Sequence, residues 1–374
     1  MLTWFRRFLL PGFIFQSLCI AGGYGTGREL AQFFLSFGPT GGLLGMLPAT
    51  LLMSAGCAVA FELARMSRCY DYRSFLNVLL GRGWIVYEVA YLLAILLILA
   101  VIGSATGALF TEAFGLPGMA GTILLLALIA FLAFKGTRLI EGVLSVWSFV
   151  LYAVYAVLFV LSMKVFGPAI REMLSYPIVE PGWFLSGVRY GALQLALVPA
   201  VLFATTWFTG RRDALVAGLL AGPILMIPAL LFMLAMLGHY PDIMQRPVPV
   251  NHMLEALDSR FLLIAFPIVL IGTFIETGTG MIHAFNERVA GSLKALGRTL
   301  PAAARPAIAI ALLVGALLLS RWGIIDLIAV GYGAMTWVFI GILVIPLLTL
   351  GAWKVFTRRL GAPPPAARAD DGQG

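Results

Sequence analysis

The sequence predicts an all-α integral membrane protein with ten transmembrane helices. Hydrophobic residues make up 61% of the 374 residues and charged residues only 11%. Soluble proteins carry about 25% charged residues, because their surfaces face water. The chain also divides into ten apolar runs, most of them near the roughly 20 residues that a helix needs to cross a bilayer. Composition and run length together exclude a soluble protein.

The predicted transmembrane helices follow one another along the chain. In chain order they span residues 8–36, 40–64, 84–111, 118–134, 141–163, 184–208, 213–238, 260–287, 303–320 and 325–352. The first and eighth runs are longer than a straight crossing requires.

The distribution of positive charge predicts the orientation. With a cytoplasmic N-terminus, 18 of the 25 Lys and Arg residues fall on cytoplasmic segments and 5 on outer loops. Cytoplasmic loops of membrane proteins are enriched in Lys and Arg, so we expect both termini in the cytoplasm and the protein in the bacterial inner membrane. The same rule explains the net charge of +8 without a nucleic-acid partner.

Ten helices of alternating direction divide into two units of five. A repeated unit with an odd number of crossings enters the membrane from the opposite side the second time, which is the inverted repeat of many transporters. We therefore expect residues 1–170 to form the first five-helix repeat and residues 171–356 the inverted second one. The polar, proline-rich residues 357–374 are expected to be a disordered cytoplasmic tail.

The first run contains a glycine-rich segment that predicts an interrupted helix. Residues 22–27 read GGYGTG, with four glycines in six positions, and Arg28 and Glu29 follow directly. Each glycine disfavours a helix by up to about 1 kcal/mol relative to Ala. A break would expose backbone groups that bind ions or polar solutes at membrane depth. The alternative is a close helix-packing motif, formed by the GxxxG pair Gly23 and Gly27.

The eighth run carries a polar helical face. Steps of three and four residues place Thr273, Glu276, Thr277 and His283 on this face, together with Gly280 and Glu287. A carboxylate inside a membrane helix is expensive and is therefore a functional candidate. The alternative is a polar seam that ties helices together.

The sixth run and the outer loops give weaker signals. Gly191, Gln194 and Pro199 would support a second break, in the helix that opens the second repeat. Residues 165–183 and 238–260 are expected to be long outer loops, either plain linkers or a lid over the site. Near the cytoplasmic ends, Glu62 and Glu88 are expected to pair with Arg65 or Arg82.

These motifs resemble a known family. GGYGTGRELAQFF and GTFIETGTGMIHAFNER, in a ten-helix layout, are similar to the YkvI-like bacterial membrane proteins, grouped with the amino acid–polyamine–organocation superfamily. That resemblance implies a leucine-transporter-like fold with helices one and six broken around a central solute site. It also implies a sodium site between carbonyls near Ala21 to Gly23 and hydroxyls of helix eight. The charges Arg28, Glu29 and Glu276 depart from the usual pattern and leave room for proton coupling or a charged solute.

The predicted function is secondary active transport of a small polar or zwitterionic, amino-acid-like solute, by sodium- or proton-driven symport. An uncoupled channel or facilitator is the alternative, and an intramembrane enzyme is less favoured because no nucleophile–base motif or metal-ligand spacing occurs. No cofactor is expected beyond a coupling ion; the partners are the solute and the lipid bilayer, and the oligomeric state is left open. The predicted solute-binding residues are Gly22, Gly23, Tyr24, Gly25, Thr26, Gly27, Arg28 and Gln194. The predicted ion-coupling residues are Ala21, Gly22, Thr273, Glu276, Thr277, Thr279 and His283, with sodium expected at Ala21, Thr273 and Thr277.

Overall fold

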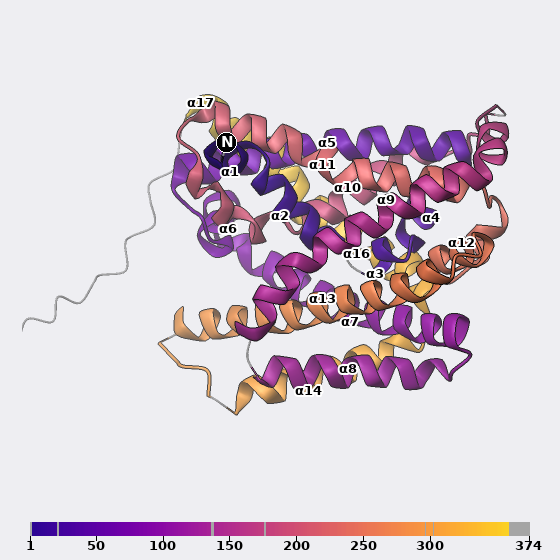
Figure 1. The fold of residues 1–374 in the computed structure, drawn as a ribbon. Coiled ribbons are helices and arrows are strands. Elements are labelled where there is room, and N and C mark those ends of the chain that lie inside the picture. Colours follow the sequence, from indigo (N-terminus) through magenta and orange to yellow (C-terminus); the bar gives the residue numbers. More distant parts are fainter. Residues whose placement is uncertain are drawn as a thin grey trace, which may run out of the picture.

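The computed structural model describes residues 2–20, 22–135, 138–175, 177–295, 297–301 and 303–358, and these residues are almost entirely helical (Figure 1). Six helical stretches are long and apolar enough to cross a membrane by length and composition. They are α5 (Pro39–Ser67), α7 (Trp84–Phe114), α9 (Arg138–Ser175), α11 (Arg211–Leu237), α13 (Arg260–Ala295) and the C-terminal stretch that begins at Ile324 and ends at Thr357.

Shorter elements complete the bundle. The apolar ones are α2 (Leu10–Cys19), α8 (Gly118–Lys135), α10 (Trp183–Leu195) and α14 (Ala304–Ser320). The remaining α-helices are α1 (Leu2–Phe8), α3 (Gly22–Gly25), α4 (Arg28–Phe33), α6 (Tyr72–Leu80), α12 (Pro249–Ala256), α15 (Ile324–Asp326), α16 (Gly333–Phe339) and α17 (Ala352–Thr357). The 3-10 helices are η1 (Leu35–Phe37), η2 (Gly81–Gly83), η3 (Val198–Ala200), η4 (Leu202–Trp207) and η5 (Asp242–Gln245), and the π-helices are η6 (Leu327–Tyr332), η7 (Ile340–Val344) and η8 (Leu347–Gly351).

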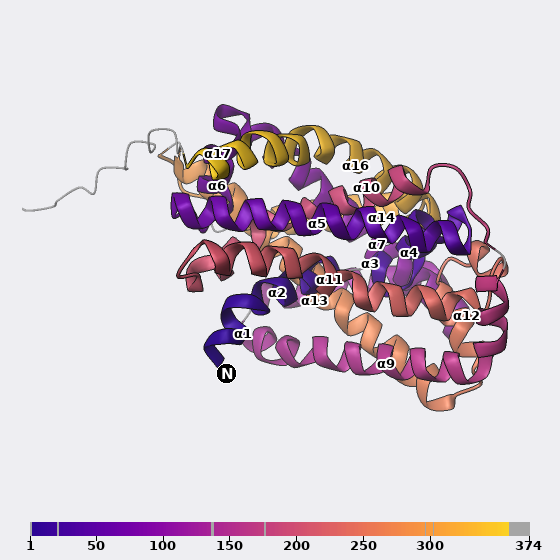
Figure 2. The same cartoon turned by 90° about the horizontal axis from the view of Figure 1, so that it is seen from above.

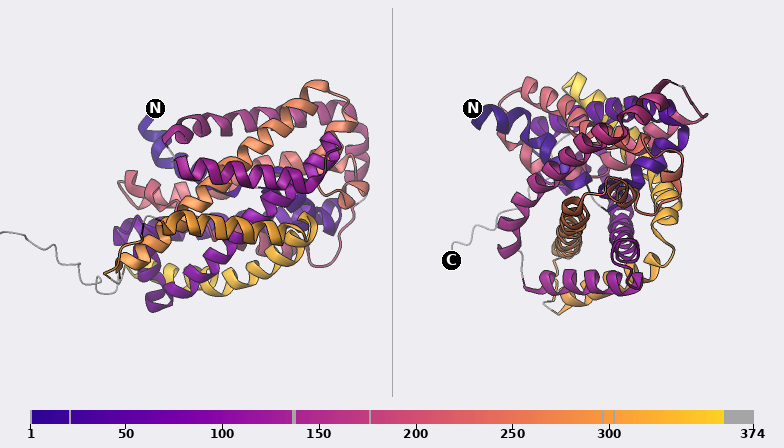
Figure 3. Two further views of the ribbon diagram at one scale, coloured as in Figure 1. Left: turned by 90° about the horizontal axis from the view of Figure 1, so that it is seen from below. Right: turned by 45° about the vertical axis from the view of Figure 1, so that its right-hand side comes forward.

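The long helices share one rough direction, and the short elements gather at its two ends. Helices α1, α6 and α17 lie at one end of the bundle and α12 lies at the other, in both Figure 1 and Figure 2. The right-hand view in Figure 3 looks more nearly along the long helices. We call the end with α1, α6 and α17 the terminal end, and the end with α12 the lid end. All three elements at the terminal end come from segments predicted to be cytoplasmic, and α12 comes from a predicted outer loop.

Helix α11 contains two internal prolines, and neighbouring helices satisfy the carbonyls that they leave free. Proline has no backbone N–H, so the carbonyl four residues earlier loses its helical partner. Ser54 Oγ donates to the Leu219 carbonyl, four residues before Pro223, at 2.9 Å. Gln16 Nε2 donates to the Ile224 carbonyl, four residues before Pro228, at 2.7 Å. These bonds tie α5 and α2 to α11.

Glycines let the central helices approach closely. A Cβ atom on Gly187 of α10 would overlap the carbonyl of Gly45 in α5. On the other side of α5, a Cβ on Gly218 of α11 would overlap the backbone of Ala58. Small residues at such contacts are typical of membrane helix packing, where dispersion contacts and interhelical hydrogen bonds hold helices together.

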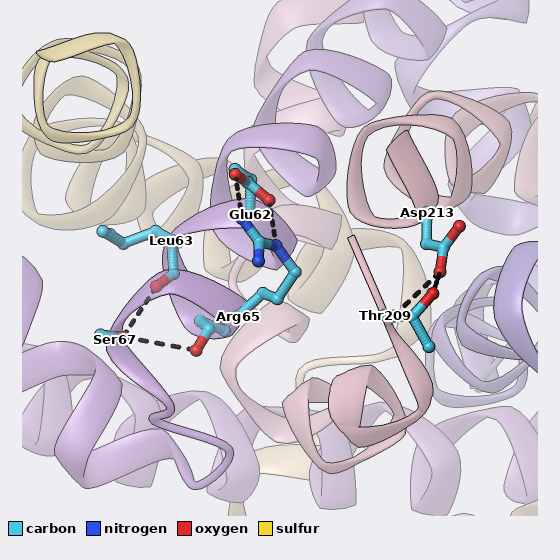
Figure 4. Close-up of polar contacts among 7 residues, drawn as sticks. Glu62, Leu63, Arg65, Ser67, Thr209 and Asp213 are labelled. Atoms are coloured by element: carbon cyan, nitrogen blue, oxygen red, sulfur yellow. Dashed lines mark hydrogen bonds and ion pairs between the residues drawn. The ribbon is translucent and has the colours of Figure 1, made fainter. Parts of the chain in front are cut away.

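Ion pairs and caps secure the terminal end of α5 and α11. Glu62 accepts two hydrogen bonds from Arg65, each 2.7 Å long, and Asp213 accepts bonds of 2.9 Å from both the amide and the hydroxyl of Thr209 (Figure 4). The expected pairing of Glu62 with Arg65 is confirmed.

Two local predictions are wrong. The predicted loop 165–183 is helical up to Ser175, because α9 continues through Pro168. Helix α6 lies in a predicted connection; its apolar side chains Phe75, Leu76 and Leu79 are buried on one face.

The tenth predicted span, residues 325–352, is helical and contains three π-helical segments.

Candidate functional site: two interrupted helices around a small cavity

The first interruption separates α2 from α4. Helix α2 ends at Cys19, and Gly27 has a left-handed backbone with φ 81°, which glycine adopts without strain. The prediction that all of 22–27 is non-helical is wrong in part, because Gly22–Gly25 forms the single helical turn α3. One short turn tolerates several glycines, since long-range contacts hold it. Ala21, a predicted sodium ligand, lies outside the described residues.

Polar groups from other elements satisfy the backbone around this interruption. Tyr155 of α9 donates to the Gly25 carbonyl at 3.0 Å. The Thr26 hydroxyl donates to the Gly23 carbonyl at 3.0 Å. The Val250 amide, at the start of α12, donates to the Thr26 carbonyl at 3.1 Å. The interruption is therefore anchored by a core helix and by the lid end.

The second interruption lies in the sixth predicted helix. Helix α10 ends at Leu195, and the chain continues as the 3-10 helices η3 and η4, with Pro199 inside η3. Tyr87 of α7 donates to the Ala196 carbonyl at 2.7 Å, which satisfies a backbone acceptor at the break. The structure thus shows an interruption where Gln194 and Pro199 suggested one.

A small cavity of about 40 Å³ lies where the two interruptions meet. Its lining includes Cys19 from α2, Glu29 from α4 and Gln194 from α10, with Tyr91 and Tyr332 on other sides. Gln194 Nε2 donates to Glu29 Oε2 at 3.4 Å. A volume of this size holds a few water molecules at most.

Arg28 is directed away from this cavity. Its guanidinium donates to the carbonyls of Met244 and Arg246, in the segment between α11 and α12, at 2.7 and 3.3 Å, and to Gln32 at 3.2 Å. We define the lid as residues 238–257, which include η5 and α12. Arg28 and the bond from Val250 to Thr26 hold the lid against the first interruption.

The lid also contains a histidine pair. The rings of His239 and His252 are 5.3 Å apart, and Phe166 of α9 lies 4.4 Å from His239. Burial, together with the neighbouring His252, lowers the pKa of His239 to about 4. This imidazole is therefore neutral at physiological pH.

A charged network lies on the other side of the cavity. Arg288 of α13 pairs with Glu88 of α7 at 2.8 Å, and its guanidinium lies 3.7 Å from the Tyr72 ring and 3.9 Å from the Tyr91 ring. The prediction that Glu88 pairs with Arg82 is thus wrong. The long-range pair forms because α13 crosses α7, which local sequence spacing does not reveal. Tyr91 belongs both to this network and to the cavity wall.

The predicted polar face of α13 is distributed over different environments. Thr273 and Thr279 are buried, Glu276 and Thr277 are half-buried, and His283 is exposed. The Thr273 hydroxyl donates to the Val269 carbonyl at 3.0 Å, and the Thr279 hydroxyl donates to the Ile275 carbonyl at 2.7 Å. A Cβ on Gly25 would lie 2.8 Å from Leu270, so α13 packs against the first interruption one turn from Thr273.

The structure brings together Gln194 and the segment Gly22–Gly25, and it separates Arg28 and His283 from them. Sequence reasoning omitted Glu29 as a site residue, although its carboxylate lies beside Gln194. Its position inside an apolar run was the available signal. Cys19 and Tyr332 carried no such signal, because isolated Cys and Tyr residues in membrane helices are usually packing residues.

These features define a helical membrane protein with two interrupted helices around a small cavity that Glu29 and Gln194 help to line. No protein-family model matches the chain. It is 24% identical over 282 residues to the uncharacterized membrane protein YkvI of Bacillus subtilis, and the match covers 74% of this chain and 79% of that protein.

Among solved structures, the chain resembles a manganese transporter from Eremococcus coleocola, crystallised with an aromatic bis-isothiourea substituted compound. The TM-score is 0.52 at 16% identity, covering 94% of this chain and 77% of the transporter. A mutant of that transporter gives a TM-score of 0.47 at 15% identity, covering 95% and 88%. The similarity shows a shared fold. The relative from Bacillus subtilis is described as a membrane protein and the solved structure as a manganese transporter.

Proposed function

We propose that this chain is a secondary active transporter for a small polar or zwitterionic solute resembling an amino acid. Transport is driven by sodium or protons and proceeds by alternating access. The observation that carries the proposal is the meeting of two interrupted helices at one buried polar cavity. Interrupted helices place free backbone groups at membrane depth, where transporters bind solutes and ions.

The closure of the cavity favours alternating access over an open pore. The lid covers one side through Arg28 and Val250, and the network of Arg288 and Glu88 lies on the other. A pathway closed at both ends corresponds to an occluded state, from which each side opens in turn.

The proposal includes a specific architecture. Ten crossings form two inverted repeats, residues 1–170 and 171–356, in a leucine-transporter-like fold of the YkvI-like family, with residues 357–374 as a cytoplasmic tail. The terminal end then faces the cytoplasm of a bacterial inner membrane. The interruptions after α2 and α10, each in the first helix of its repeat, support this arrangement.

The coupling ion is proposed to bind between the first interruption and α13. The contact of Gly25 with Leu270 supports this location, because Thr273 lies on the next turn of α13 and is buried. Glu276 and Thr277 continue the same face. The solute itself would contact Gly22–Gly25 and Gln194.

Reconstitution into liposomes tests the proposal. A thermal-shift screen of amino acids and organic acids, with and without sodium, first identifies ligands, since ligands that bind the folded state raise its apparent stability. The proposal predicts accumulation of a hit above equilibrium when a sodium or proton gradient is imposed. Equilibration without accumulation would instead indicate a facilitator.

A glycine substitution links uptake to the site. Gly23→Leu places a side chain where Glu29 lies, so we expect loss of uptake from a protein that still folds. Gly341→Leu is the matched control, because a Cβ on Gly341 meets nothing within 4 Å. Equal uptake by both variants would remove the cavity from the transport pathway.

A further inference from the structure

The central cavity holds a carboxylate without a basic partner. Glu29 is only 2% exposed, and it is the one formally charged side chain among the described residues that line the cavity. Cys19, Gln194, Tyr91 and Tyr332 are uncharged there at neutral pH. The adjacent Arg28 directs its charge to the lid carbonyls instead. A buried carboxylate without a counter-charge is strongly disfavoured, so Glu29 is stable here either in its protonated form or with a bound positive charge beside it.

The carboxylate of Glu29 also fills the place that an anionic solute would need. It folds back against the first interruption, where a Cβ on Gly23 would overlap its carboxyl group. Free amides at an interrupted helix are the natural seat for a solute carboxylate. Because Glu29 occupies that binding position, the carboxylate of an anionic or zwitterionic solute would be repelled by the carboxylate of Glu29.

Neutral oxygens lie beside the carboxylate. Gln194 donates its amide nitrogen to Glu29, which leaves its carbonyl oxygen as an acceptor. The hydroxyl of Tyr190, one turn before Gln194 on α10, is buried near Glu29 and Gln194. The aromatic walls Tyr91 and Tyr332 suit a cation as well.

We propose that the central cavity binds a small monovalent cation, either the ammonium group of a compact amine or an alkali ion, with Glu29 as its counter-charge. The inference rests on the proposed transport function and assigns the central cavity to a cation in place of a zwitterionic solute. One carboxylate balances one positive charge, and the volume of about 40 Å³ suits a compact ion.

Binding to the purified full-length protein tests this assignment. The probes are methylammonium chloride and sodium chloride. The carboxylate-bearing probes are glycine and choline acetate, the latter measured against choline chloride so that only the anion differs. We expect saturable stabilisation by methylammonium, by sodium or by both, and none by acetate or glycine. Glu29→Gln should lower the apparent cation affinity roughly ten- to hundredfold, as expected for losing one charged hydrogen-bonding group. Glu287→Gln is the matched control, because Glu287 is an exposed carboxylate paired with Arg305.

Two further variants locate the effect. Gln194→Glu adds a second carboxylate beside Glu29 and should shift the binding preference from monovalent to divalent cations. This variant tests the site even if Glu29→Gln does not fold. Thr273→Val reports on the separate ion site proposed beside α13. If the stabilisation by sodium follows Thr273 while methylammonium has no effect, the assignment of the cation to Glu29 is overturned.

Other outcomes separate this inference from the transport proposal. Unchanged cation binding in Glu29→Gln, or binding of acetate, overturns the cation site, whether or not the protein transports a solute. A stability that depends on pH in the parent protein but not in Glu29→Gln, and that neither cation changes, shows that Glu29 binds a proton. That result also overturns the cation site. Cation binding that requires Glu29, without gradient-driven accumulation of any ligand, leaves the site standing and removes the transporter.

Discussion

In the proposed transport mechanism, Glu276 is the residue whose charge decides how transport is coupled. It is half-buried on α13, and its side chain has no hydrogen bond or ion pair with another described residue. If it binds the coupling ion or carries a proton, Glu276→Gln keeps the shape and removes the function. We expect gradient-driven accumulation to collapse to the equilibrium distribution while the melting temperature stays near that of the parent. Accumulation at the parent level, at every pH and sodium concentration tested, would reduce Glu276 to a packing role.

At the same scale, His239 should make the lid sensitive to acid. Its pKa is about 4 in the folded protein against 6.5 in an unfolded chain, because burial and His252 disfavour the charged form. The unfolded state therefore takes up a proton first as the pH falls. The stabilisation is complete above pH 6.5 and is lost as the pH falls through 4.

Hydrogen exchange of residues 238–257 measures this effect. Lid amides should exchange progressively faster, relative to intrinsic rates, as the pH is lowered from 7 to 5. His239→Gln should flatten this dependence, whereas the exposed His283→Gln should keep it. If lid amides of His239→Gln still exchange faster at low pH, a group other than His239 causes the pH dependence.

At the scale of elements, α11 depends on hydrogen bonds from its neighbours. Gln16→Leu leaves the Ile224 carbonyl without a donor and should lower the free energy of unfolding by about 0.5 to 2 kcal/mol, the range for interhelical bonds in membranes. Pro228→Ala restores the backbone N–H that this carbonyl lacks. In that background Gln16→Leu should cost less, although Tyr152 still loses its acceptor.

A double-mutant cycle, followed by unfolding in detergent, gives the coupling between positions 16 and 228. Strictly additive effects would mean that the bond from Gln16 does not compensate for Pro228.

Elements also mark where sequence-based prediction succeeds and fails. The apolar runs predict the long helices well, because composition alone decides which segments enter a bilayer. Glycines and prolines predict both interruptions within a few residues. The directions of Arg28 and Glu29 were not predictable, since the left-handed Gly27 rotates α4 relative to α2. The pair of Arg288 and Glu88 joins positions 200 residues apart, which no local pattern encodes.

At the scale of the whole molecule, the charge asymmetry makes a direct prediction about orientation. Two kinds of reporter domain are compared, one that is active only in the cytoplasm and one that is active only on the outer side of the membrane. Fused to the N-terminus or after Arg358, only the cytoplasmic reporter should be active. Inserted between Asp258 and Arg260, only the reporter for the outer side should be active. Opposite locations for the two termini would require an odd number of crossings and would overturn the inverted repeat.

The lid has a consequence for how this protein can evolve. It is held by its main chain: the carbonyls of Met244 and Arg246 accept from Arg28, and the Val250 amide donates to Thr26. Backbone groups are common to all residues but proline, so these contacts place little demand on the side chains at 244 and 246. In a saturation-mutagenesis library selected for function, both positions should accept most substitutions, while position 28 should accept almost none. The lid sequence around positions 244 and 246 is thus free to diverge among related proteins, whereas Arg28 beneath it is not.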